Sequence, residues 1–126
     1  MKEVWIVDDD DEMARAISLM LKVLDYHSKH YNHARPAAQA LLAGQRPDLL
    51  ILDINMPEVT GLDMLEFVRR RREWKHLPVI MLSSEAADVT VDKAMQLGAD
   101  GYVMKPVTIE ELEKTMAQAF YKHLER

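Results

Sequence analysis

Carboxylate, hydroxyl and ammonium side chains follow four short apolar segments of this sequence. They are Asp8, Asp9, Asp10 and Asp11 after the first segment, Asp53 after the second, Ser83 and Ser84 after the third, and Lys105 with Pro106 after the fourth. Carboxylates that gather within a few ångströms repel one another and tend to bind protons. A divalent cation relieves this repulsion, and an all-oxygen set of ligands suits Mg²⁺, with Mn²⁺ as the alternative.

Such a set of groups is suited to phosphoryl transfer onto a carboxylate. A cation held by two or three carboxylates keeps coordination positions open for a phosphoryl oxygen, while a lysine and a hydroxyl bind the other oxygens. The nucleophile would be one of the carboxylates, and the product would be an acyl phosphate. Each motif alone more often indicates a turn or a helix cap, so the prediction depends on their joint position after four strands.

Five segments have the pattern of strands, and five have the periodicity of helices. Continuous apolar runs, typical of parallel strands buried on both faces, lie at 4–7, 48–52 and 78–82, and weaker segments typical of edge strands lie at 27–31 and 101–104. Helices are predicted at 13–24, 34–43, 61–72, 87–97 and 109–120. The aspartate run is a candidate N-cap for the first helix, and Thr108 with Glu111 is a candidate capping box for the last. The alternation predicts a (βα)5 fold of the α/β class with its site at the carboxyl ends of the strands.

Composition limits the remaining function classes. The 126 residues fit one domain, and 48% hydrophobic residues are enough for a sizeable core. A net charge of -5 argues against a domain that neutralises nucleic-acid phosphates. The absence of cysteine excludes disulfides and thiolate chemistry. Because the sequence has no apolar run of membrane-spanning length, we expect a soluble cytoplasmic protein.

The motifs at the strand ends resemble those of the receiver domain of bacterial response regulators. The likeness covers essentially the whole chain, and five motifs occur in the family's order: Val7-Asp8-Asp9, Leu52-Asp53 through Met56-Pro57 to Gly61, Met81-Leu82-Ser83, Gly98-Ala99-Asp100-Gly101-Tyr102, and Lys105-Pro106. The resemblance implies a flavodoxin-like three-layer sandwich with a five-stranded parallel sheet in the order 2-1-3-4-5. It also implies one receiver domain over residues 1–126, either stand-alone or excised from a longer protein.

The resemblance assigns a role to individual residues. It implies that Asp53 is the phosphoacceptor and that Asp8, Asp9, Asp53 and the backbone carbonyl of Asn55 hold Mg²⁺. It implies that Ser83 and Lys105 contact the phosphoryl group, and that Ser83 and Tyr102 form the conformational switch. It also implies that the Lys105-Pro106 bond is cis.

The implied function is a phosphorylation-activated switch in two-component signalling. A sensor histidine kinase or a histidine phosphotransfer protein would donate the phosphoryl group from a phosphohistidine. The signal would leave through the surface of the fourth helix, fifth strand and fifth helix to an output domain or protein, without direct contact with nucleic acid or membrane. The domain would assist its own phosphorylation and autodephosphorylation rather than act as an enzyme, as a monomer or a phosphorylation-dependent dimer.

Two alternatives belong to other function classes. A degenerate receiver would serve only as a docking module. A phosphatase of the haloacid dehalogenase type also uses strand-end aspartates, and Asp8 with Asp10 has the Asp-x-Asp spacing of its nucleophile motif. The chain is short for that fold.

Some positions depart from the commonest family pattern. Asp11 extends the acidic run, and we assign it to helix capping. Ser84 stands where a smaller residue is frequent, and we hypothesise that Asn55, Ser84 and Glu85 help to set the lifetime of the phosphoryl group. Gly101, together with the absence of arginine from the last helix, argues against the subfamily fused to winged-helix DNA-binding domains.

A group of histidines and a run of arginines could suggest other functions, which we reject. His27, His30 and His33 are evenly spaced, but residues 27 and 30 of a strand point to opposite faces, so we expect solvated histidines at a sheet edge rather than a zinc site. The run from Arg69 to Arg72 ends a predicted helix, where cations favour the helix dipole, so we expect a solvated helix end rather than a nucleic-acid contact.

Overall fold

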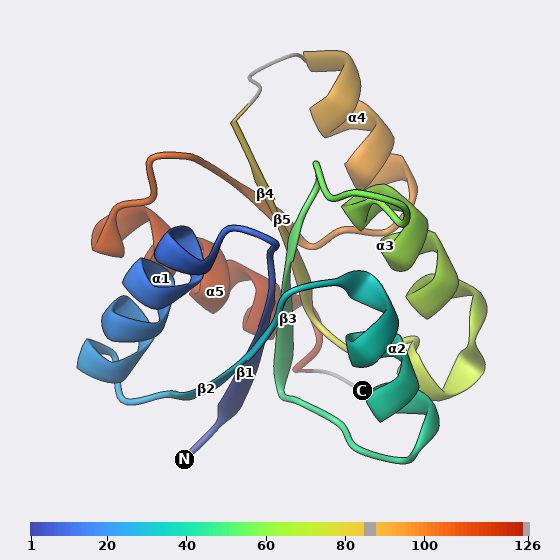
Figure 1. Ribbon diagram of the computed structural model, residues 1–126, viewed down its shortest axis with the longest axis horizontal. Helices are drawn as coiled ribbons and strands as arrows, with labels where there is room; N and C mark the ends of the chain where they lie inside the picture. Colours follow the sequence, from blue (N-terminus) through green and yellow to red (C-terminus); the bar gives the residue numbers. More distant parts are fainter. Residues whose placement is uncertain (85–87, 125–126) are drawn as a thin grey trace.

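A central parallel sheet organises the protein, whose structure is a computed structural model describing residues 1–84 and 88–124. Its strands are β1 (Glu3–Val7), β2 (His27–Tyr31), β3 (Leu49–Asp53), β4 (Val79–Ser83) and β5 (Gly101–Met104). They pair in the order β2-β1-β3-β4-β5 (Figure 1). This order confirms the flavodoxin-like α/β prediction, and the two weak segments are indeed the edge strands β2 and β5.

Helices cover both faces of the sheet. One face carries α1 (Asp11–Val23) and α5 (Ile109–Lys122), and the other carries α2 (Ala34–Leu42), α3 (Gly61–Arg70) and α4 (Asp88–Gln96) (Figure 1). The prediction that the third helix runs to residue 72 was wrong, because Arg71 adopts an extended backbone conformation and a separate 3-10 turn follows at Arg72–Trp74. Residue 87, the predicted start of the fourth helix, lies outside the described residues. No helix in the described part of the chain is long and apolar enough to span a membrane.

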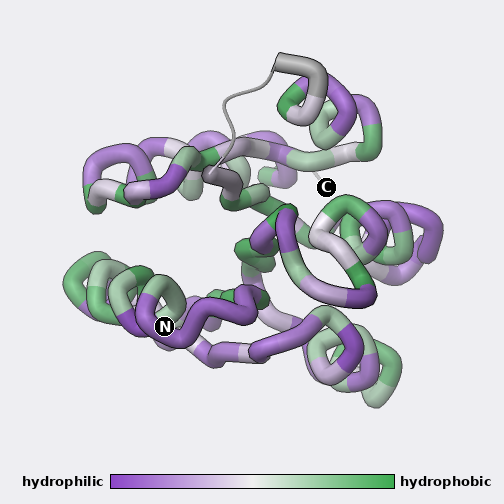
Figure 2. The backbone as a smooth tube through the Cα atoms, turned by 45° about the horizontal axis from the view of Figure 1, so that its top comes forward, coloured by the Kyte–Doolittle hydropathy of each residue, from purple (hydrophilic) through white to green (hydrophobic). Residues whose placement is uncertain are grey.

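Alternate residues of β3 point into two separate hydrophobic cores. Leu50 and Leu52 pack beneath α2, α3 and α4, whereas Leu49 and Ile51 pack beneath α1 and α5. Hydrophobic strand segments accordingly lie at the centre of the molecule, and the helices alternate between hydrophilic and hydrophobic residues (Figure 2). Because both faces of the strand are covered, its position is fixed, and so is that of Asp53 at its carboxyl end.

Capping side chains fix the starts of the helices that follow the site loops. Asp10, not Asp11, is the N-cap of α1, because its carboxylate accepts from the backbone N–H groups of Glu12 and Met13. The side chain of Asp11 instead accepts from Asn32 at 2.9 Å. Thr108 accepts from the N–H of Glu111 at 3.2 Å, which is one half of the predicted capping box.

A reciprocal capping box that the sequence analysis did not identify begins α3. The Thr60 hydroxyl accepts from the N–H of Asp63 at 3.2 Å, and the Asp63 carboxylate accepts from the N–H of Thr60 at 3.1 Å. This box holds the start of the helix directly after the loop that leaves Asp53.

Arg69 is not part of a solvated helix end, and our expectation for it was wrong. Its guanidinium donates to the carbonyls of Gly98 at 2.9 Å and Leu77 at 2.7 Å, and it pairs with Asp100 at 2.9 Å. Both side chains of the ion pair are largely buried, with 14% and 9% exposure. Burial lowers the pKa of Arg69 and the charge of Asp100 opposes this, but an arginine in a protein stays protonated. The residue therefore ties α3 to the segments that enter β4 and β5.

Replacement of Arg69 by methionine should destabilise the fold far more than the same change at its neighbour. Arg69→Met leaves Asp100 and the three carbonyls of Gly98, Trp74 and Leu77 without their charged donor. We expect a loss of about 2–4 kcal/mol in the free energy of unfolding. Arg70→Met breaks only an exposed pair with Glu66 at 3.5 Å and should cost below about 0.5 kcal/mol. Urea unfolding of the two variants measures the difference, and equal losses would contradict the role given to Arg69.

Candidate functional site

Acidic side chains from two strand ends converge at the rim of the sheet. Asp8 and Asp9 follow β1, and Asp53 is the last residue of β3. One ligand oxygen from each of the three carboxylates lies within 4.8 Å of the others. Asp8 and Asp53 are buried and Asp9 is exposed, so the group is open to solvent on one side only. The predicted acidic cluster is thus brought together by the fold.

Lys105 faces this cluster from the loop after β5. Its Nζ lies 3.3 Å from Oδ2 of Asp8 and 3.4 Å from Oδ1 of Asp53. Burial alone would lower the pKa of Lys105, but the two carboxylates outweigh burial and raise it. The peptide bond between Lys105 and Pro106 is cis. The ammonium is therefore held in its charged form against the two buried carboxylates.

The charged form of the Asp53 carboxylate is electrostatically unfavourable. Burial and the nearby charge of Asp8 raise its pKa to about 6, although Lys105 and the N–H of Asn55, 3.4 Å away, act in the opposite direction. Gly61 lies directly behind this loop, and a Cβ there would collide with the backbone carbonyl of Asp53. The position therefore admits only glycine without a shift of the loop that carries Asp53.

The charges and donors at the rim fit a bound cation. Oδ1 of Asp8 accepts from the N–H of Asp10 at 2.9 Å. Oδ2 of Asp8, in contrast, is buried and has no aligned hydrogen bond among the described residues. Three carboxylates converge there against one ammonium, and a hard divalent cation with oxygen ligands would complete the unmet interactions.

The carboxyl end of β4 adds hydroxyl groups to the same rim. Ser83 is fully buried, and its carbonyl accepts from the N–H of Lys105 at 2.8 Å, so the two residues have a fixed backbone relation. Ser84 is exposed. Glu85, the third residue in our hypothesis about phosphoryl lifetime, lies outside the described residues.

The sequence of this chain matches one known protein family. The family model described as response regulator receiver domain matches residues 4–117. The chain belongs to this family. Receiver domains act in two-component signalling, bind Mg²⁺ through an acidic pocket and interact with histidine kinases and output partners, in a regulatory rather than an enzymatic role.

This receiver domain is similar to both single-domain and longer regulators. It is 36% identical over 118 residues to the chemotaxis protein CheY of Pseudomonas aeruginosa, over 94% of this chain and 95% of that protein. It is 33% identical to the KDP operon transcriptional regulatory protein KdpE of Escherichia coli, over 98% of this chain and 53% of that protein. The solved structure of Vibrio cholerae chemotaxis protein CheY4 matches with a TM-score of 0.85 and 31% identity, over 94% of this chain and 98% of that chain.

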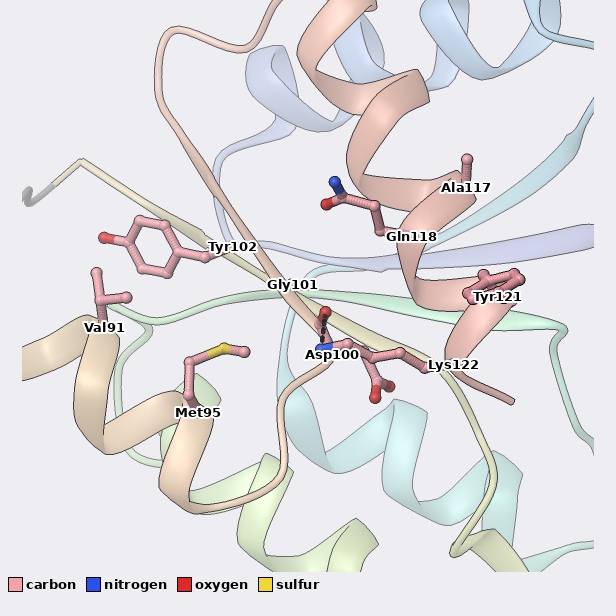
Figure 3. A pocket seen from close by; sticks show the side chains of 9 residues that line it. All are labelled: Val91, Met95, Asp100, Gly101, Tyr102, Ala117, Gln118, Tyr121 and Lys122. Carbon is pink, nitrogen blue, oxygen red and sulfur yellow. Dashed lines mark hydrogen bonds between the residues drawn. The ribbon is translucent and has the colours of Figure 1, made fainter. Parts of the chain in front are cut away.

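The receiver also carries a groove on the surface of α4, β5 and α5, away from the acidic rim. Tyr102 of β5 lies beside Val91 and Met95 of α4 at one wall, and Gln118 and Tyr121 of α5 form the other (Figure 3). The open groove has a volume of about 650 Å³. The predicted switch aromatic therefore lines the surface through which we expect the signal to leave.

Gly101 forms the floor of this groove for a steric reason. A Cβ at this position would lie 2.5 Å from Cγ2 of Thr115 on α5. A larger residue here would require the side chain of Thr115 to shift. The close approach gives a physical basis for glycine at the position where the winged-helix subfamily carries an acid.

One contact of the receiver site was missed by the sequence analysis. Nε2 of His30 lies 2.7 Å from the backbone carbonyl oxygen of Asp8, so this histidine is not simply solvated as we expected. His27 is exposed. Within residues 1–84 and 88–124, the group of acidic or histidine side chains whose ligand atoms converge consists of Asp8, Asp9 and Asp53.

The raised pKa of Asp53 makes the stability of the Mg²⁺-free receiver depend on pH. Since its pKa in the folded protein, about 6, exceeds the ordinary 3.8, folding favours protonated Asp53. The stabilisation is complete below about pH 4 and is lost as the pH rises through about 6. Asparagine is neutral throughout, so Asp53→Asn should raise the free energy of unfolding by about 1–2 kcal/mol at about pH 7.5, and this gain should shrink as the pH falls.

Urea unfolding with a chelator at several pH values measures this difference. Asp92→Asn, at an exposed position on α4, is the matched control because it removes a carboxylate outside the acidic cluster. A stability gain from Asp53→Asn that does not change with pH would contradict the electrostatic explanation.

Proposed function

We propose that this receiver domain is a phosphorylation-activated switch with Asp53 as its phosphoacceptor. The observation that carries the proposal is the convergence of Asp8 and Asp53 on Lys105, whose Nζ lies within 3.4 Å of both carboxylates. Asp53 ends β3, the central strand of the sheet. It therefore lies between the acidic pair that follows β1 and Ser83 at the end of β4. We further propose that residues 1–126 form one receiver domain.

The transfer would move one phosphoryl group between two nucleophiles. A carboxylate oxygen of Asp53 attacks the phosphorus of a phosphohistidine, an O–P bond forms as the N–P bond breaks, and the imidazole leaves. Lys105 neutralises charge on one phosphoryl oxygen, and the hydroxyl of Ser83 donates to another. The donor would be a sensor histidine kinase or a histidine phosphotransfer protein.

The acidic residues would hold the metal ion that this chemistry requires. Asp8, Asp9 and Asp53, with the backbone carbonyl of Asn55, would bind Mg²⁺, or Mn²⁺ in its place. When bound, the ion would neutralise charge on the phosphoryl oxygens and on the carboxylates themselves. Asp10 would not be a ligand, because its carboxylate is already engaged in capping α1.

The phosphorylated state would be read at the groove of α4, β5 and α5. A phosphoryl group on Asp53 would attract the hydroxyl of Ser83 and shift the end of β4, and Tyr102 on the neighbouring strand would change its position in the groove. Such a change biases an existing equilibrium between two states. An output domain or protein would bind the altered surface, and dimer formation would be one form of that output.

The side chains that flank the rim would set how long the phosphoryl group persists. Ser84 is exposed beside buried Ser83, and its hydroxyl would influence the access of water to the acyl phosphate. Asn55 lies in the loop after β3, two residues beyond Asp53. The rate of dephosphorylation would therefore respond to changes at these positions and at Glu85.

Two rival functions are weaker on specific grounds. Membership of the receiver family sets aside the haloacid dehalogenase phosphatase, and the capping role of Asp10 removes its second motif residue. A docking module that accepts no phosphoryl group would have no need for a largely buried acidic cluster whose charge a single lysine neutralises only in part.

Phosphorylation by a small-molecule acyl phosphate tests the proposal directly. We expect the wild-type protein to gain the mass of one phosphoryl group in the presence of Mg²⁺ and none with a chelator. Asp53→Asn should abolish the gain, because an amide is not a nucleophile towards phosphorus, and Lys105→Met should slow it by about 10-fold or more. Intact-mass spectrometry over time provides the measurement.

The control for this experiment is Asp92→Asn, the same substitution at an exposed aspartate of α4. It should be labelled at the wild-type rate. Equal labelling of wild type and Asp53→Asn would refute the assignment of the phosphoacceptor, and no Mg²⁺-dependent labelling of the wild type would favour the docking module.

A further inference from the structure

We propose that His30 is a positioning residue for the metal site, which it serves by fixing the peptide bond between Asp8 and Asp9. The inference rests on the proposed function, because it concerns the two residues that would bind Mg²⁺. His30 is not itself one of the proposed ligands; its hydrogen bond is to the backbone between them.

Chemistry allows only one direction for this hydrogen bond, from the histidine to the carbonyl. Nε2 of His30 lies 2.7 Å from the carbonyl oxygen of Asp8, and a carbonyl oxygen only accepts. Nε2 must therefore carry the hydrogen and donate it. A neutral imidazole in this tautomer makes the bond, so the contact needs no extra charge beside the acidic cluster.

The bond replaces a backbone contact that the sheet no longer supplies. The N–H of Asp8 still donates to the carbonyl of Tyr31 at 3.1 Å, which continues the ladder between β1 and β2. The strand β2 ends at Tyr31, so the next ladder position opposite the Asp8 carbonyl is no longer in the strand. The side chain of His30 provides the donor there.

The bonded carbonyl belongs to the peptide unit that joins the two proposed ligands. A peptide unit is planar and includes the Cα atoms of both residues that it links. A hydrogen bond to the Asp8 carbonyl therefore restricts the directions in which the side chains of Asp8 and Asp9 leave the backbone. Oδ1 of Asp8 is held separately by the N–H of Asp10 at 2.9 Å.

Side-chain hydrogen bonds of its neighbours tie the end of β2 that carries His30 to α1. Side chains alternate along β2, so His30 lies on the same side as Ser28, whose hydroxyl is 2.6 Å from that of Ser18 on α1. One residue beyond the strand, Asn32 donates to the carboxylate of Asp11 at 2.9 Å. The end of this half-buried edge strand thus contacts the acidic run at two points, the carbonyl of Asp8 and the carboxylate of Asp11 at the start of α1.

Removal of the donor should weaken metal binding without removing a ligand. Loss of outer contacts that orient metal ligands typically weakens affinity by about 10- to 100-fold. We expect about 10-fold for His30→Phe, which keeps a ring of similar size but has no N–H, and a change below about 3-fold for His30→Gln, whose side-chain amide can donate to the same carbonyl.

Calorimetric titration with Mg²⁺ alone, without a phosphoryl donor, measures the affinity of each variant. Thermal unfolding in the absence of metal, run beside it, shows that each variant is folded at the titration temperature. His27→Phe and His27→Gln, at the exposed start of the same strand, are the matched controls and should bind as the wild type does. If His30→Phe does not fold, His30→Leu takes its place as the variant without a donor.

The outcomes separate this inference from the proposed function. Weakened binding in His30→Phe with recovery in His30→Gln supports the positioning role. Wild-type affinity in His30→Phe, even with lowered stability, would overturn it, and so would equal weakening in both variants, since the amide restores the donor. Failure of the wild type itself to bind Mg²⁺ would instead refute the metal site of the proposed function.

Discussion

Repulsion between two buried carboxylates is the constraint on which the rest of this structure depends. Asp8 and Asp53 lie together at the rim of the sheet, and one ammonium, that of Lys105, opposes them. The balance is incomplete, because the pKa of Asp53 remains raised to about 6 in spite of the lysine. A receiver site in this state has an excess of negative charge. The fold must hold the carboxylates in place against it, and a divalent cation is the kind of ligand that reduces it.

The parallel sheet meets this requirement by fixing each charged residue at the end of a buried strand. β3 is covered on both faces, so Asp53 cannot move away from Asp8 without disturbing two cores. Gly61 and the capping box of Thr60 with Asp63 fix the path of the chain after Asp53. β5, by contrast, is an edge strand, and the groove of α4, β5 and α5 lies beside it. Because Lys105 directly follows β5, this edge strand connects the acidic rim to the groove that Tyr102 lines.

Much of this arrangement was predictable from the sequence, for a definite physical reason. Strands buried on both faces need continuous apolar runs, and the carboxyl ends of parallel strands share one rim, so residue type after each run was sufficient to predict the cluster. Long-range polar contacts were not predictable in this way. Arg69 was taken for part of a solvated basic run, since nothing nearby in sequence shows that Asp100 and Gly98 would enclose it. Asp10 and Asp11 are equally able to cap a helix, and only the backbone geometry distinguishes them.

Two of the side chains whose roles were missed, Arg69 and His30, have a common task. Arg69 donates to the carbonyls of Leu77 and Gly98 just before β4 and β5 begin, and His30 donates to the carbonyl of Asp8 just after β1 ends. In each case a backbone carbonyl lies just outside the ladder of the parallel sheet, and an unpaired carbonyl in a partly buried position is costly. Arginine and histidine are suited to the task because each carries its donor well beyond the backbone. When a polar residue lies in a sheet covered on both faces, the backbone groups at the ends of neighbouring strands should be considered as its hydrogen-bond partners, as well as solvent. By that criterion, a histidine on the strand beside the acidic loop is a structural neighbour of the site even though it is not one of its ligands.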